Sequence, residues 1–152
     1  MNNPRNLFFS ILLVIGFAVA LHAQAKPNFT GTWKLNVAKS ELGDPPAESL
    51  TVEVDHKDPV LTYTVKGTAG GQDINETATL KTDGTPTKGP NDMTFVCHWD
   101  GPTLVLNGTA PDTSPIFEVR LSLSADGKTI TRTIVRKNGN QQQTRHEIYD
   151  KV

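Results

Sequence analysis

Period-two alternation of apolar and polar side chains is the feature that most constrains this sequence. Between residues 116 and 124, Phe117, Val119 and Leu121 alternate with polar neighbours, and the same pattern recurs in segment after segment. Successive side chains of a β-strand point to opposite faces, so this alternation predicts strands with one buried face. No helical period appears after residue 25. The sequence therefore predicts an all-β domain.

The alternating segments are short and follow one another in simple order, separated by glycine, proline and aspartate. They predict about nine strands, at 29–35, 48–55, 60–66, 73–81, 93–99, 103–108, 116–124, 128–136 and 141–149. Closing such an antiparallel up-and-down meander into a barrel removes its costly edge strands, whereas a two-sheet sandwich is the alternative. The second face of the strands is threonine and charge, which argues against an outward apolar band of an outer-membrane barrel.

Aspartate-glycine pairs predict the tight hairpins of this meander. A two-residue turn at Asp100-Gly101 would pair Cys97 with Leu104 and Phe95 with Leu106. Apolar side chains then face each other across the two strands. A further turn at Asn138-Gly139 leads into segment 141–149, whose polar pattern leaves its facing open.

The Asp126-Gly127 turn sets Leu121 opposite Arg132 and so puts a charge on an apolar face. An isolated buried charge costs several kcal/mol, so Arg132 needs a carboxylate or water. Glu76 is carried inward by the parity of its strand and is one candidate partner. A carboxylate or phosphate of a bound ligand is the other, because a guanidinium binds either group with two hydrogen bonds.

The N-terminus carries an export signal. Arg5 precedes an apolar run from Leu7 to Leu21, and the small-residue motif Ala23-Gln24-Ala25 follows it. We expect residues 1–25 to be a cleaved signal peptide and 26–152 to be the folded domain. The mature protein is then secreted or periplasmic and does not span the membrane.

Charge and cysteine content exclude several functional classes. The formal net charge is −1 and no basic run occurs, which argues against nucleic-acid binding. Cys97 is the only cysteine, so no internal disulfide can form, and its alternation with apolar residues predicts a buried thiol. His56, His98 and His146 lie on separate elements without metal-ligand spacing. We assign no catalytic residue, no metal and no cofactor, and the sequence does not mark the protein as an enzyme.

The first strand opens with Gly31 and Trp33, in the run Phe-Thr-Gly-Thr-Trp-Lys-Leu from 29 to 35. With the meander, this Gly-x-Trp motif resembles the lipocalin-like, or calycin, barrels, and the chain is similar to small exported bacterial proteins of that type. The resemblance implies a barrel that carries a small apolar ligand. It also implies that Trp33 packs beneath the barrel against an arginine of a late strand, Arg132 or Arg136.

The predicted function is therefore an exported protein that holds an apolar or amphipathic molecule, which could be acidic, in a β-barrel. The candidate ligand-binding residues are the inward aromatic and polar side chains Tyr63, Glu76, Phe95, Phe117 and Arg132. The alternative is a packed β-domain without a cavity that serves as a structural or protein-interaction module, because a barrel of about eight strands can also be filled by its own side chains. A nine-strand meander would place the roomy loops 82–91 and 109–115 at the end opposite loop 37–47, which leaves the open end undecided.

Overall fold

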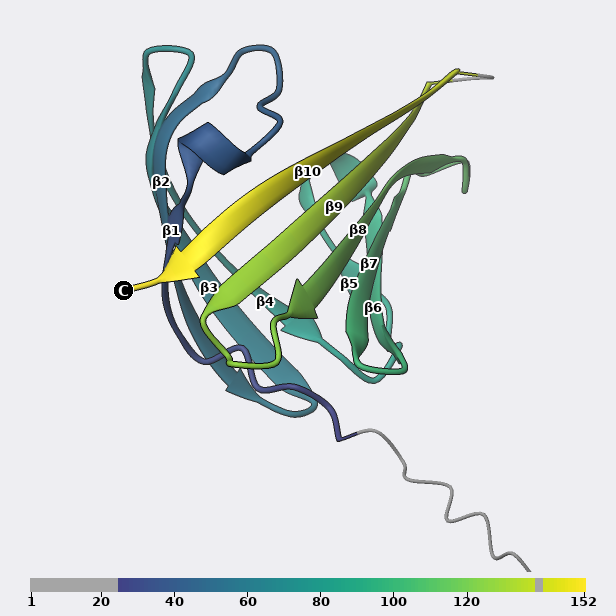
Figure 1. Cartoon of the computed structure of the whole chain (residues 1–152). Helices are drawn as coiled ribbons and strands as arrows, with labels where there is room; N and C mark the ends of the chain where they lie inside the picture. The colour runs from purple at the N-terminus through teal and green to yellow at the C-terminus, as the bar shows by residue number, and fades with distance from the viewer. Residues whose placement is uncertain (1–24, 139–140) are drawn as a thin grey trace, which may run out of the picture.

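The computed structural model describes residues 25–138 and 141–152. One antiparallel sheet contains every strand of this part of the chain, in the order β4-β3-β2-β1-β10-β9-β8-β7-β6-β5. The strands are β1 (Gly31–Leu35), β2 (Ala47–Lys57), β3 (Val60–Ala69), β4 (Gln72–Lys81), β5 (Thr87–Lys88), β6 (Thr94–Asp100), β7 (Thr103–Thr109), β8 (Pro115–Leu123), β9 (Thr129–Asn138) and β10 (Gln141–Lys151). Figure 1 shows the sheet rolled into a nearly closed barrel. The predicted all-β meander is confirmed.

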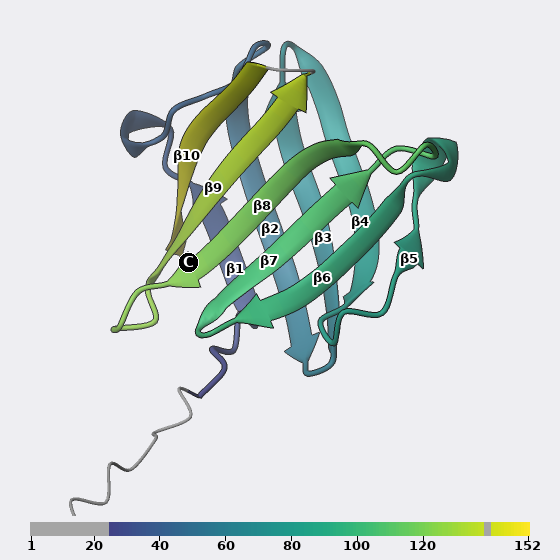
Figure 2. The same cartoon turned by 90° about the vertical axis from the view of Figure 1, so that its right-hand side faces the viewer.

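The barrel has ten strands where the sequence predicted about nine. The additional strand is β5, whose two residues pair with β6 inside the segment predicted as the loop 82–91. A single sheet accounts for all ten strands, so the sandwich alternative is wrong. β4 and β5 are its two edges, and Figure 2 shows the gap between them.

The short strand β5 also changes which loops share an end of the barrel. It adds one reversal of chain direction, so loops 36–46 and 110–114 both lie at the upper end in Figure 1, on opposite sides of the barrel. The turns 101–102 and 124–128 lie at the lower end, where the N-terminal segment enters. The predicted placement of loop 109–115 was wrong because it did not count β5, whereas residues 82–86 do lie at the lower end, as predicted.

A register was predicted for two of the three hairpins and can be compared with the observed pairing. The β8–β9 register sets Leu121 opposite Arg132, as predicted. In the β6–β7 hairpin, Cys97 pairs with Leu106 rather than with Leu104. The turn is formed by residues 101 and 102 because proline has no N–H to donate to the ladder. A shift of two residues preserves the inward parity. The Gly139 position of the third turn lies outside the described residues.

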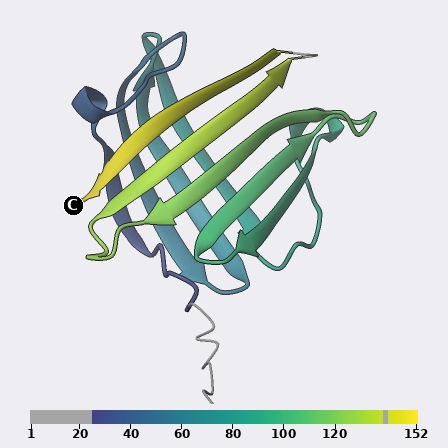
Figure 3. The same ribbon diagram turned by 45° about the vertical axis from the view of Figure 1, so that its right-hand side comes forward.

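Short connections complete the fold. A 3-10 turn, η1 (Val37–Lys39), follows β1, and its flanks bond to the edge of β10 through Asn36 N–H to Ile148 O and Glu41 N–H to His146 O. A second 3-10 turn, η2 (Pro90–Asp92), joins β5 to β6. Within residues 25–138 and 141–152, no helix has the length and apolar character needed to cross a membrane. Figure 3 views the same arrangement from an intermediate angle.

Candidate functional site

The lower end of the barrel is closed by three stacked rings. Phe29, from the segment before β1, lies 6.0 Å from the ring of His56 and 6.1 Å from that of Trp99, between ring centroids. His56 and Trp99 stack in turn at 5.8 Å. The N–H of Phe29 donates to His56 Nδ1 at 3.3 Å, so the chain that precedes β1 is tied to β2. These contacts make this end the floor of the barrel.

The carboxylate of Asp58 joins the floor to the adjacent chain segments through hydrogen bonds. It accepts from Thr82 Oγ1 at 2.6 Å, from Trp99 Nε1 at 3.0 Å and from Lys26 Nζ at 3.0 Å. The hydrogen bonds from Thr82, Trp99 and Lys26 hold the pKa of Asp58 well below its usual range. The N-terminal segment, the β2–β3 turn and the start of the β4–β5 connection are therefore joined at one carboxylate.

Trp33 lies directly above this floor and is 1% exposed. Its indole N–H donates to Phe29 O at 2.9 Å, which satisfies the polar atom of a buried ring. The cation over the Trp33 ring is Lys151 of β10, at 5.3 Å from the ring centroid to Nζ. The resemblance implied Arg132 or Arg136 in this role. Arg132 instead pairs with Glu147, and Arg136 is exposed.

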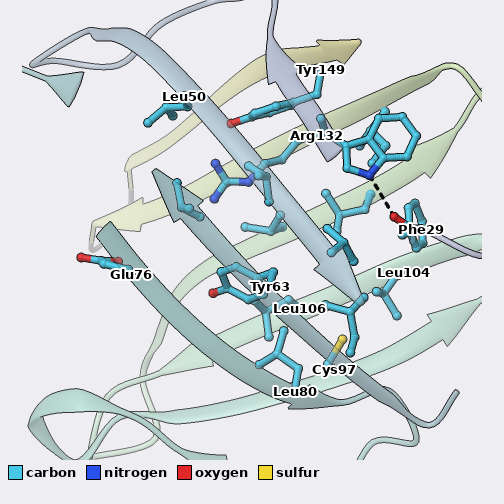
Figure 4. A pocket seen from close by; sticks show the side chains of 18 of the residues that line it. Phe29, Leu50, Tyr63, Glu76, Leu80, Cys97, Leu104, Leu106, Arg132 and Tyr149 are labelled. Carbon is cyan, nitrogen blue, oxygen red and sulfur yellow. Dashed lines mark hydrogen bonds between the residues drawn. The ribbon is translucent and has the colours of Figure 1, made fainter. Parts of the chain in front are cut away.

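Above Trp33 the barrel encloses a cavity of about 310 Å³. Its wall is largely aliphatic and aromatic, and Figure 4 shows the side chains converging on it from both halves of the sheet. The polar groups of this wall are the side chains of Tyr63, Glu76, Cys97, Arg132 and Tyr149. A volume of this size lies at the lower end of the range of small-molecule pockets. The interior is thus not filled by its own side chains, unlike that of the alternative packed domain.

Arg132 points into the barrel, as its register predicted, but its partner is Glu147. Arg132 Nη1 donates to Glu147 Oε2 at 2.8 Å. Tyr149 O–H donates to the same oxygen at 3.0 Å, and Arg145 Nη2 lies 3.2 Å from Oε1. The predicted internal partner, Glu76, lies at the exposed margin of the cavity. Glu147 takes this place because the β9–β10 register sets it directly opposite Arg132.

The Arg132 guanidinium keeps a face toward the cavity. The Glu147 side chain is 5% exposed, whereas that of Arg132 is 36% exposed although it lies on the inner face. Figure 4 shows its guanidinium projecting between Tyr149 and Tyr63. Burial lowers the pKa of Arg132, but the charges and hydrogen bonds of Glu147 and Tyr149 together outweigh this and raise the pKa above its ordinary value. The guanidinium is therefore a permanent cation with unused N–H donors on its cavity side.

A second cavity, of about 350 Å³, lies beside the first at the gap between β4 and β5. Phe95 and Phe117 line it with ring centroids 5.9 Å apart, and Lys88 and Pro90 border it from the β5 side. Glycine at position 89 lets the Phe95 ring approach, because a Cβ there would lie 2.0 Å from Phe95 Cε2. The gap at the edge of the sheet is thus lined by aromatic side chains.

Cys97 is a free cysteine, 2% exposed, in the wall of the first cavity. Burial raises the pKa of its thiol to about 11. The predicted burial of Cys97 is confirmed. A thiol with this pKa is protonated at neutral pH and is a poor nucleophile.

Comparison with known proteins identifies the architecture. No model of a known protein family matches the chain, and no curated protein matches it in sequence. Among solved structures, secretory abundant heat soluble protein 4 from Ramazzottius varieornatus matches with a TM-score of 0.57 and 16% identity over 85% of this chain and 99% of that chain. The fold is a calycin-like β-barrel.

Two further calycin-like barrels match. Zebrafish ileal bile acid-binding protein, solved with cholic acid, has a TM-score of 0.57 and 12% identity over 82% of this chain and 98% of that one. The fatty-acid-binding protein of Manduca sexta has a TM-score of 0.52 and 14% identity over 81% of this chain and 99% of that one. At these identities the likeness concerns the fold.

The barrel places each of the five predicted ligand-binding residues in the lining of one or both cavities, with Glu76 at the exposed margin. Tyr63 and Arg132 line both cavities, Glu76 lines the first, and Phe95 and Phe117 line the second. Their part in binding a ligand stays a prediction.

Sequence reasoning missed Glu147 and Tyr149, on a strand whose facing was left open. The Asn138-Gly139 turn predicted from the sequence could have revealed which face of segment 141–149 points inward. Any turn there with an even number of residues puts Glu147 on the same face of the sheet as Arg132.

Proposed function

We propose that this protein binds an apolar or amphipathic small molecule inside its barrel, with a polar or acidic group of that molecule directed at Arg132. The observation that carries the proposal is the cavity of about 310 Å³, whose mostly apolar wall contains a permanent cation with unused donors. An apolar pocket with a few convergent polar groups is the usual form of a small-molecule site. Two similar barrels support it, since one is a fatty-acid-binding protein and the other is a bile acid-binding protein in complex with cholic acid.

We further propose that the protein acts outside the cytoplasm, in the periplasm or as a secreted protein. The support is the sequence pattern of residues 1–25, with an apolar run and a small-residue cleavage motif. Sequencing the N-terminus of the exported protein tests this. We expect the mature chain to begin at Lys26, and a chain that still contains Leu7 would contradict export by cleavage.

The first experiment on the ligand is a native mass spectrum of protein purified from its own source. We expect a copurified mass that is released by denaturing solvent. Protein that carries no added mass, and that binds no member of a panel of apolar and amphipathic compounds, would contradict the proposed function.

A matched pair of variants then locates the binding site. Val65 lines the cavity, whereas its neighbour Thr64 bonds to Thr77 on the outer face of the sheet. We expect Val65→Phe to weaken binding of an environment-sensitive dye at least tenfold, because the added ring fills cavity volume, a loss of about 1.4 kcal/mol. Thr64→Phe should leave dye affinity unchanged. Equal effects of the two substitutions would place dye binding outside the barrel.

A further inference from the structure

The two cavities share part of their wall, and two polar side chains that a ligand can reach lie at this junction. Five residues line both cavities: Tyr63, Leu80, Leu106, Val119 and Arg132. Only Tyr63 and Arg132 among them carry polar side chains. No hydrogen bond joins the Tyr63 hydroxyl to another described residue, and Arg132 bonds to Glu147 through Nη1, with Tyr149 as a further close neighbour of its guanidinium. The junction therefore offers N–H and O–H donors to a molecule that lies against it.

The surroundings of the junction are mostly apolar on both sides, with Glu76 at the margin of the first cavity and Lys88 at that of the second. Toward the first cavity lie aliphatic side chains such as Leu50 and Val65, and toward the second lie the rings of Phe95 and Phe117. A ligand that occupies both cavities has apolar parts at its two ends. Its polar group then falls at Arg132, between those parts.

Arg132 already has an anionic partner, which it shares with Arg145. Glu147 is buried and both of its oxygens are engaged, Oε2 by Arg132 and Tyr149 and Oε1 by Arg145. A carboxylate on the ligand would share Arg132 with this fixed negative charge, and like charges repel strongly in a desolvated interior. An uncharged acceptor can take the free N–H groups without that repulsion and with a smaller desolvation cost.

We propose that the interior selects an elongated apolar molecule whose uncharged oxygen acceptor, a ketone or ester carbonyl, lies near its middle and accepts hydrogen bonds from Arg132 and Tyr63. This inference rests on the proposed function and narrows it to a chemical class. It differs from a site for a terminal carboxylate, in which the charged end of the molecule would meet Arg132.

Positional isomers provide the test, because they share composition and apolar surface. Displacement of Nile red, an uncharged dye, gives the affinities of 8-pentadecanone, 2-pentadecanone and pentadecanoic acid. We expect 8-pentadecanone to bind about tenfold more tightly than 2-pentadecanone, the effect of one hydrogen bond to a charged donor. It should also bind more tightly than the acid.

Three variants assign the preference to the junction. Tyr63→Phe removes one donor and should reduce the ratio between the ketones, as should Arg132→Met. Glu147→Gln removes the neighbouring negative charge and should shift the preference about tenfold toward pentadecanoic acid. Thr64→Val removes a hydroxyl from the outer face of the same strand as Tyr63 and should leave the ratio between the ketones unchanged. Because Tyr63→Phe alters only one hydroxyl, it remains informative if Arg132→Met does not fold.

The outcomes separate the inference from the proposed function. Equal binding of the two ketones, or tighter binding of 2-pentadecanone or of the acid by the unmodified protein, overturns the inference and leaves a binding barrel. Failure of Nile red and all three compounds to bind overturns both. A ratio between the ketones that persists in both Tyr63→Phe and Arg132→Met also overturns the inference, because the preference would then arise elsewhere.

Discussion

At the scale of single residues, Glu147 holds the polar part of the interior together. It accepts from Arg132 and Tyr149 and pairs with Arg145, and its side chain is 5% exposed. A buried ion pair is weak evidence of stability in itself, but removal of one partner strands the other. The important consequence is that Arg132 is oriented before any ligand arrives.

We expect Glu147→Gln to lower the free energy of unfolding by about 3 kcal/mol, because two guanidiniums lose their counter-charge. Urea unfolding monitored by tryptophan fluorescence gives this value. Glu76→Gln, at the exposed margin of the cavity, is the matched control and should change stability by less than about 0.5 kcal/mol. If Glu76→Gln were the more costly change, Arg132 would pair with Glu76 in solution.

His56 should make stability depend on pH. Burial lowers the pKa of His56 from its ordinary value near 6.5, and the nearby carboxylate of Asp58 opposes this only in part. Its Nδ1 accepts from Phe29 N–H, which a protonated ring cannot do. Nε2 lies 3.8 Å from Asp58 Oδ1, too far for a hydrogen bond, and has no partner among the described residues. The folded protein thus favours the neutral imidazole.

The unfolded chain then binds more protons than the folded one once the pH falls below about 6.5, so the free energy of unfolding should fall with pH there. One such group gives a slope of at most about 1.4 kcal/mol per pH unit. Urea unfolding between about pH 5 and pH 7.5 measures it. His56→Gln keeps an acceptor for Phe29 N–H but does not titrate, and should flatten the slope. An unchanged slope would assign the pH dependence to other groups.

At the scale of elements, the β2–β3 hairpin requires a glycine at position 67, where a side chain would overlap the backbone of the facing strand. Gly67 has φ of +151°, and a Cβ at this position would lie 1.9 Å from the carbonyl oxygen of Ser49. The register between β2 and β3 shifts at this point, between Ala47 and Ser49. A backbone carbonyl cannot move aside as a flexible side chain can, so the hairpin depends on this residue.

We expect Gly67→Ala to destabilise the protein by more than about 3 kcal/mol, because it combines backbone strain with overlap of backbone atoms. Gly71→Ala is the control, since Gly71 also has positive φ, +72°, but a Cβ added to it would meet no atom within 4 Å. It should cost only about 1 kcal/mol. Thermal unfolding of both variants measures the difference, and similar midpoints would show that close approach at Gly67 is unimportant.

At the scale of the whole molecule, the barrel is closed unevenly. The floor is sealed by stacked rings and by the bonds from Thr82 N to Pro59 O and from Gly84 N to Cys97 O. Between the edge strands β4 and β5 no ladder forms in the described chain. The second cavity borders this opening. The least constrained part of the wall is therefore beside the candidate site.

Amide hydrogen exchange should report this asymmetry. We expect the amides of β4 and β5 to be less protected than those of β9, which pairs with β8 and β10 along most of its length. Bound ligand should increase protection most at β4, because β4 lines both cavities. Uniform protection of β4 and β9 would instead indicate that the gap closes in solution.

The sequence by itself determined the all-β class, the meander, the inward face of most strands and the inward position of Arg132. These follow from local rules. Alternation assigns each side chain to a face, and the Asp126-Gly127 turn determines which residues of the two flanking strands share a face. A register shift of two residues leaves this assignment unchanged. For that reason the wrong register predicted at Asp100-Gly101 still assigned the correct side chains to the inner face.

Only the tertiary structure decided the partner of Arg132, the grouping of loops at each end, the cavity volumes and the floor. Glu147 lies opposite Arg132 because of the particular register between β9 and β10. The two residues of β5 are too few for alternation to predict a strand, yet β5 reverses the direction of every later strand. Lys26, Asp58, Thr82 and Trp99 come from four separate segments of the chain. Contacts of this kind depend on how the sheet curves and closes. Periodicity along one strand contains no information about how far apart residues of distant segments lie in the closed barrel.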